Sequence, residues 1–136
     1  MTVQTAATTR SLNQIAGWVA GIVFVLVGLL GFTVSGGHDM AGMSGGELVG
    51  IFQVNHLHNV VHLLVGAGLI SGAMAGAKAA RTVNTLVGVV YLVVGVLGLF
   101  ILGSSANILA LNGYDNWLHL FSGAALVGLG AWGDKN

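Results

Sequence analysis

Long apolar stretches separated by short polar segments dominate this chain. About 20 apolar residues are needed to carry a helix across a hydrocarbon core roughly 30 Å thick. Four stretches meet this condition, at about residues 12–34, 56–77, 82–103 and 116–133. We therefore predict an all-α fold, a transmembrane four-helix bundle that forms a single domain over residues 1–136.

The composition supports lipid as the solvent of this chain. Hydrophobic residues make up 55% and charged residues 6% of the sequence, and the mean hydropathy is +0.90. The formal net charge is zero and no basic run is present, which argues against a nucleic-acid partner. The sequence has no cysteine, so disulfides and thiolate metal sites are excluded. It has no proline either, so each helix can run without a break.

The basic residues predict how the helices are oriented. All four lie on one side of the predicted bundle, at Arg10, Lys78, Arg81 and Lys135, with Lys78 and Arg81 in the turn between spans two and three. By the positive-inside rule this side faces the cytoplasm. The first apolar stretch is longer than the roughly 7–15 residues of a signal peptide and no A-x-A site follows it. We expect a multi-pass protein of the inner (plasma) membrane with both termini in the cytoplasm.

The second and fourth spans begin with related sequences. Residues 55–67 read NHLHNVVHLLVGA and residues 112–124 read NGYDNWLHLFSGA, with six identical positions. Spans one and three also share the spacing of three glycines and one aromatic residue, from Gly21 to Gly31 and from Gly88 to Gly98. This pattern predicts an internal repeat, residues 12–77 and 82–133, that forms two pseudo-symmetric helical hairpins.

Two segments also carry a family resemblance, LHNVVHL at residues 57–63 and DNWLH at residues 115–119. With them the chain resembles the actinobacterial four-span integral membrane proteins that are classed as a domain of unknown function. The similarity covers spans two to four and the outer loops closely and span one more loosely. It implies a four-helix architecture in the inner membrane, and it brings no established activity, substrate or cofactor.

Polar residues form one stripe on each of the two related spans. At 3.6 residues per turn, one face of span two and one face of span four collect the following residues: Asn55, His58, Asn59, His62 and Gly66, and Asn112, Asp115, Asn116, His119 and Gly123. Polar side chains are costly to expose to lipid, so we expect both stripes to face the bundle interior and each other, in the outer half of the membrane.

The first interpretation of these stripes is structural. Asn55 and Asn112 are suitable N-cap residues, and Asp115 suits the positive end of a helix dipole. Interhelical hydrogen bonds would then fix the register of the helices without any chemistry.

The second interpretation is a metal site. His58 and His62 lie four residues apart on one helix, and Asp115 and His119 lie four residues apart on the other. Three imidazoles and a carboxylate suit a divalent Zn, Fe or Cu ion. Asn59 and Asn116 would then hold the ligands in place.

The third interpretation is b-type haem. His62 and His119 would be its axial ligands, and Gly66 and Gly123 would leave room for the porphyrin. The corresponding function is a haem or redox membrane protein. A separate alternative is an oligomeric carrier of a small solute or ion, in which the polar stripe lines the pathway.

Two further features complete the sequence-based expectations. Gly68, Gly72 and Gly76 form a GxxxGxxxG series that allows close helix packing, within the bundle or in a homo-oligomer. The sequence contains no Ser/His/Asp arrangement, phosphate loop or cofactor fingerprint, so we predict no catalytic residues. The leading hypothesis is a small non-enzymatic membrane protein whose polar cluster is structural or binds a metal.

Overall fold

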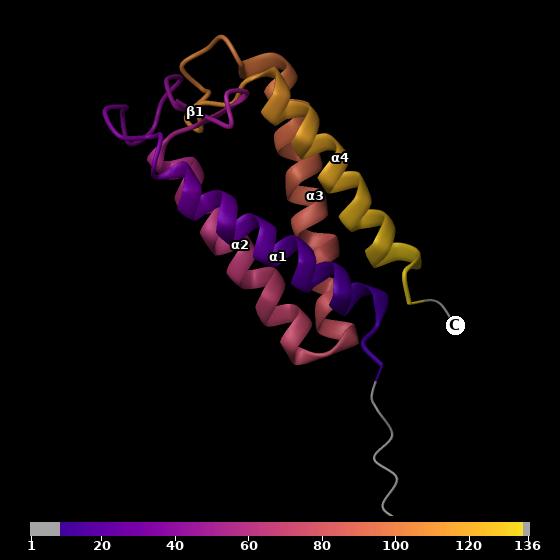
Figure 1. Cartoon of the computed structure of the whole chain (residues 1–136). Coiled ribbons are helices and arrows are strands. Elements are labelled where there is room, and N and C mark those ends of the chain that lie inside the picture. The colour runs from indigo at the N-terminus through magenta and orange to yellow at the C-terminus, as the bar shows by residue number, and fades with distance from the viewer. Residues whose placement is uncertain (1–8, 135–136) are drawn as a thin grey trace, which may run out of the picture.

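The computed structural model describes residues 9–134, and over these it contains four helices and one two-stranded sheet. The helices form two antiparallel pairs, in which α1 packs mainly against α2 and α3 mainly against α4 (Figure 1). The all-α prediction is therefore confirmed apart from the small sheet; Lys135 lies outside the described residues. The elements are α1 (Leu12–Gly31), β1 (Gly46–Leu48), β2 (Phe52–Val54), α2 (His56–Ala75), α3 (Ala77–Ile101) and α4 (Gly113–Trp132).

The membrane character of the bundle rests on three of its helices. Within the described residues, α1, α2 and α3 are long and apolar enough to cross a membrane. Their outward side chains are apolar, with Val19 60% exposed and Leu86 61% exposed. Helix α4 is as long as α1, with 20 residues, but its first turns carry Asp115, Asn116 and His119, which lower its hydropathy. The prediction of four apolar spans is thus confirmed for three helices, and the fourth crossing remains a prediction.

Side chains of the chain itself cap three of the helices. The Asn55 and Asn112 side chains accept hydrogen bonds from the backbone N–H of His58 and Asp115, as the N-cap prediction requires. Ser11 caps α1 in a capping box with Gln14, which the sequence analysis did not identify.

The turn between α2 and α3 differs from the prediction. Helix α3 begins at Ala77, so Lys78 and Arg81 lie in its first turns and not in a loop. The whole turn is Gly76, whose φ of 121° is open to glycine and strained for other residues. We expected Gly76 to serve helix packing. In the structure it instead provides the backbone conformation that the turn requires.

Glycines bring the two helices of each pair into backbone contact. A Cβ atom placed on Gly66 of α2 would lie 2.7 Å from the Gly21 carbonyl oxygen of α1. A Cβ on Gly88 of α3 would lie 2.8 Å from the Gly123 carbonyl oxygen of α4. Such close approach increases the van der Waals contact that holds membrane helices together.

The three glycines of the predicted GxxxGxxxG series do not form one helix-packing surface. A Cβ on Gly72 would meet the Val83 side chain of α3, so this glycine packs within the bundle. A Cβ on Gly68 would meet nothing within 4 Å among the described residues. Only Gly68 of the series therefore points to free helix surface, and the third glycine makes the turn.

Polar contacts join the helices at the end of the bundle where α1 begins. Asn84 of α3 donates to the Asn13 backbone and side-chain oxygens, at 2.9 and 3.0 Å. The Asn13 side chain donates in turn to the Leu129 carbonyl at 2.9 Å and to the Asp134 carboxylate at 2.8 Å. Helices α1, α3 and α4 are thereby fixed to one another at this level.

The loops at the opposite end cover the bundle. Strands β1 and β2 pair antiparallel, and Gly42 of the first loop forms a bridge with Leu109 of the second. The Asn55 side chain donates to the Gly42 and Ile108 carbonyls at 3.1 and 2.8 Å. The cap of α2 therefore also joins the two loops above the polar stripe.

We predict that Gly66→Ala lowers the free energy of unfolding by about 1–3 kcal/mol, because the new methyl group would overlap the α1 backbone. The measurement is loss of helical circular dichroism as SDS is titrated into detergent-solubilised protein. Gly68→Ala on the same helix is the matched control, and its open environment should leave stability unchanged or slightly raised. Equal stability of the two variants would contradict this packing.

Candidate metal centre

Three histidines from two helices meet inside the bundle. His58 and His62 of α2 and His119 of α4 each offer a ring nitrogen, and these nitrogens all lie within 4.8 Å of one another. The three residues are 1%, 6% and 6% exposed. Ring centroids are 4.4 Å apart for His58 and His62 and 5.8 Å apart for His58 and His119. The prediction that the two polar stripes face each other is thus confirmed for the histidines of α2 and α4.

Local structure places these rings. The Asn55 and Asn112 caps fix the starts of α2 and α4, and the histidines follow within the first two turns of each helix. His58 and His62 are four residues apart, so their rings lie one above the other on one side of α2. Val54, the last residue of β2, and Ala110 and Leu111, in the loop before α4, are also buried.

Most of the ring nitrogens have no partner within the protein. Nδ1 of His62 and both nitrogens of His58 are buried and make no hydrogen bond of good geometry with a described residue, although backbone carbonyls of Gln53 and Leu109 lie near the His58 ring. His119 Nδ1 lies 2.6 Å from the Asp115 carbonyl oxygen. A carbonyl can only accept, so His119 Nδ1 carries the proton and its Nε2 keeps a free lone pair. This is the arrangement in which a histidine is oriented for metal binding.

Asp115 is not part of the histidine group. Its carboxylate accepts from the backbone N–H of Asn112 at 3.0 Å and of Gln53 at 3.1 Å. The side chain thus completes the capping box of α4 and joins it to β2. Of the four predicted ligands, the structure brings together the three histidines but not Asp115.

Asn59 and Asn116 also lie elsewhere than the metal hypothesis expected. Their side chains point at Gly31 of α1 and Gly98 of α3, where an added Cβ would collide with them. The Asn59 amide donates to Ser35 Oγ at 3.0 Å. Both asparagines therefore pack between the helices of their own pair, and within the described structure neither side chain makes a hydrogen bond to a histidine ring.

The space expected for a porphyrin is filled. Gly66 and Gly123 face α1 and α3, and Cβ atoms placed on them would meet the Gly21 carbonyl and the Leu92 backbone N–H at 2.7 and 2.8 Å. The absence of side chains at these positions allows α2 to contact α1 and α4 to contact α3. The two glycines therefore do not supply the room that the haem hypothesis assigned to them.

Two aromatic residues that the sequence analysis did not assign to the site border the histidines. Tyr91 of α3 lies with its ring centroid 4.9 Å from that of His119, and Phe24 of α1 lies 5.6 Å from His62. The Tyr91 hydroxyl is buried without a partner in the described structure. The signal in the sequence was the equivalent position of Phe24 and Tyr91 in the two halves, together with a hydroxyl in the middle of an apolar span.

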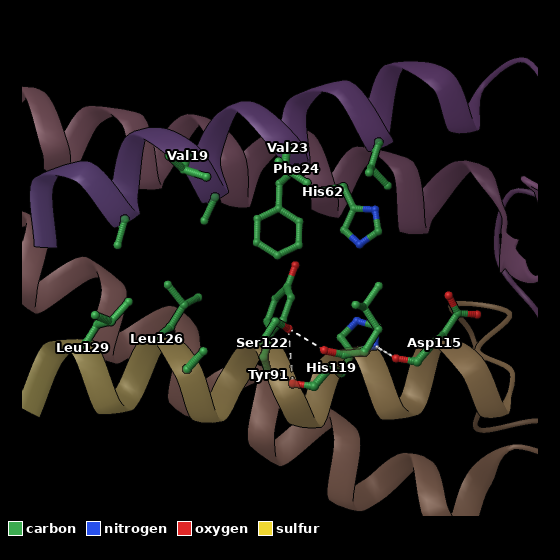
Figure 2. Close-up of a pocket in the computed structure, with 15 residues that line it drawn as sticks. Val19, Val23, Phe24, His62, Tyr91, Asp115, His119, Ser122, Leu126 and Leu129 are labelled. Carbon is green, nitrogen blue, oxygen red and sulfur yellow. Dashed lines mark hydrogen bonds between the residues drawn. The ribbon is translucent and has the colours of Figure 1, made fainter. Parts of the chain in front are cut away.

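A cavity of about 340 Å³ opens beside the cluster, between α1 and α4. Figure 2 shows Val19, Val23 and Phe24 on one wall, with Leu126 and Leu129 on the other. His62, Tyr91, Asp115 and His119 line the same cavity. A small group could thus reach the histidines from the membrane side of the bundle.

Comparison with known proteins identifies the family without an activity. Residues 14–132 match the family described as Domain of unknown function (DUF4383). No curated protein and no solved structure matches significantly. Any function of the site must therefore be argued from its geometry.

We predict that Asp115→Ala lowers the free energy of unfolding by about 1–2 kcal/mol, because two backbone N–H groups lose their acceptor. SDS titration monitored by circular dichroism measures the change. Glu47→Ala, which removes an exposed acid from β1, is the control and should have little effect. No loss in Asp115→Ala would show that the cap does not stabilise α4.

Proposed function

Because the chain belongs to the DUF4383 family, a domain of unknown function, we propose its function from the site: a non-enzymatic integral membrane protein that binds a transition metal through His58, His62 and His119. The observation that carries this proposal is the set of buried imidazole nitrogens without hydrogen-bond partners in the described structure. A buried polar group without a partner costs about 1–3 kcal/mol. A metal ion would satisfy several of these nitrogens at once.

Zn²⁺ and Cu²⁺ suit this donor set best. Both bind neutral imidazole, and three histidines with one open position form a common zinc arrangement. Tetrahedral zinc with Zn–N bonds of about 2.0–2.1 Å separates its nitrogens by about 3.3 Å. The nitrogens here lie within 4.8 Å, so small side-chain rotations would bring them to the ion. The fourth position would face the cavity between α1 and α4.

The proposal includes the position of the site in the membrane. We propose that α4 is the fourth crossing and that both termini are cytoplasmic in the inner membrane. The start of α1 and the end of α4 lie at the same end of the bundle as the turn between α2 and α3 (Figure 1). Lys78 and Arg81 lie in the first turns of α3, directly after this turn, which supports this orientation. The metal would then lie in the outer half of the bilayer.

We further propose that the chain arose by duplication of one helical hairpin. The support comes from matched contacts, since Gly21 approaches Gly66 as Gly88 approaches Gly123. Gly31 and Gly98 likewise each receive the asparagine that lies three residues before a site histidine. On this proposal, one inherited position supplies His62 and His119, and His58 is an addition of the first half.

We expect gently extracted protein to bind about one Zn²⁺ or Cu²⁺ per chain, measured by elemental analysis and calorimetric titration. His58→Ala, His62→Ala and His119→Ala should each weaken binding by more than about 100-fold, because each removes a ligand. Affinity should also fall as the pH is lowered, since protons compete with the metal for imidazole.

Two variants serve as controls. His56→Ala removes a histidine of the same helix whose ring lies against Phe32, and it should leave binding unchanged. Asp115→Asn should bind the metal as the wild type does. If the Asp115 carboxylate were a ligand, this variant would instead bind the metal more weakly. If wild-type protein takes up no metal and the three histidine variants only lower thermal stability, the cluster is structural and the proposal is wrong. A Soret band in purified protein would equally contradict it.

A further inference from the structure

The cavity between α1 and α4 is long and mainly apolar. On α4 it extends from Asp115 to Leu129, about 21 Å at 1.5 Å per residue. Its volume of about 340 Å³ falls within the roughly 300–1,000 Å³ of small-molecule sites. Val19 and Leu118 line it and are 60% and 50% exposed, so it opens onto the surface that lipid covers. A molecule dissolved in the membrane could enter without crossing water.

One end of this cavity carries polar groups that lack partners. The Tyr91 hydroxyl and His62 Nδ1 are buried without a hydrogen bond to any described residue, and both side chains line the cavity. Figure 2 shows the Tyr91 hydroxyl pointing to the space between Phe24 and His62. A buried hydroxyl without a partner marks a place where a ligand acceptor would be favourable.

The charge of the cavity limits what can bind. None of the residues that line it in the described chain is Lys or Arg, so an anionic head group such as a fatty-acid carboxylate would find no counter-ion. The Asp115 side chain, whose Oδ2 accepts from two backbone N–H groups, is acidic and supplies no positive charge. The complementary ligand is therefore neutral and offers hydrogen-bond acceptors.

The rings around the polar end favour a planar head group. Phe24 and Tyr91 meet edge to face with centroids 5.2 Å apart, and His62 and His119 lie beside them. Aromatic groups of this kind pack well against another flat ring. We propose that the cavity binds a membrane quinone, with a carbonyl oxygen accepting from the Tyr91 hydroxyl and the alkyl tail lying between Val19 and Leu126.

This quinone site does not depend on the proposed metal. His62 and His119 line the cavity and are also proposed metal ligands, but the hydrogen-bond donor is Tyr91 and the tail lies between apolar side chains, neither of which is a proposed metal ligand. Variants that weaken quinone binding should therefore retain full metal content. Failure of one proposal leaves the other to be judged on its own measurement.

The test uses the full-length protein in detergent and a benzoquinone that carries a decyl chain. Saturable one-to-one binding is measured by native mass spectrometry, with decylbenzene as the matched probe that lacks the carbonyls. Tyr91→Phe removes only the hydroxyl and should weaken quinone binding by roughly three- to tenfold, the effect of one hydrogen bond. Decylbenzene should bind more weakly and should not respond to this variant.

A second pair of variants tests the location. Ala125 lines the cavity, so Ala125→Leu should weaken quinone binding by about tenfold or more by filling the space. Ala124 is exposed and is not among the lining residues, so Ala124→Leu is its neighbouring control and should bind normally. If Ala125→Leu does not fold, Ala20→Leu on the opposite wall takes its place.

Two outcomes would overturn the quinone site. One is the absence of saturable quinone binding to wild-type protein. The other is equal binding of the quinone and decylbenzene with no effect of Tyr91→Phe, which would show that the cavity accepts any hydrocarbon chain. Binding that depends on the carbonyls, on Tyr91 and on Ala125 together would support the proposal.

Discussion

The absence of water from a bilayer core is the constraint on which this structure depends, because every polar group within it needs a partner in the protein. The chain meets this constraint by collecting its polar side chains in the interior. Asn13 and Asn84 bond to each other at one end, and the Asn55 and Asn112 caps bond to the loops at the other. The outward faces of the helices can then remain apolar.

The glycine contacts have a consequence for the shape of the interior. They hold α1 against α2 and α3 against α4 at backbone distance, which leaves α1 and α4 with few contacts to each other. The cavity lies along this weakly packed boundary, and Tyr91, His62 and His119 border it. The close packing therefore stabilises the α1–α2 and α3–α4 pairs, and it leaves a cavity between α1 and α4 next to the polar groups that lack partners.

The site gathers imidazole and hydroxyl atoms that the described interior leaves without hydrogen bonds: His58, His62 and Tyr91 each retain at least one such buried atom. Elsewhere in the described bundle, single amide oxygens of three asparagines also lack partners: Asn59, Asn84 and Asn116. Such atoms lower the stability of the folded protein when no ligand binds them. Retaining them is understandable if an ion or a neutral lipid-soluble molecule supplies the missing contacts, as the two proposals state.

The sequence alone determined the helical class, the approximate spans, the caps at Asn55 and Asn112 and the single helix faces that carry the histidines, because these follow from hydropathy and helical periodicity. Tertiary structure alone decided which neighbours each stripe residue meets. Asn59, Asn116, Gly66 and Gly123 share the helix face of the histidines, but they contact α1 or α3 because the two helices of each pair approach at backbone distance. Tyr91 could join the site only when α3 was placed beside α4. Periodicity gives the direction of a side chain on its own helix, whereas its contacts depend on how distant helices pack.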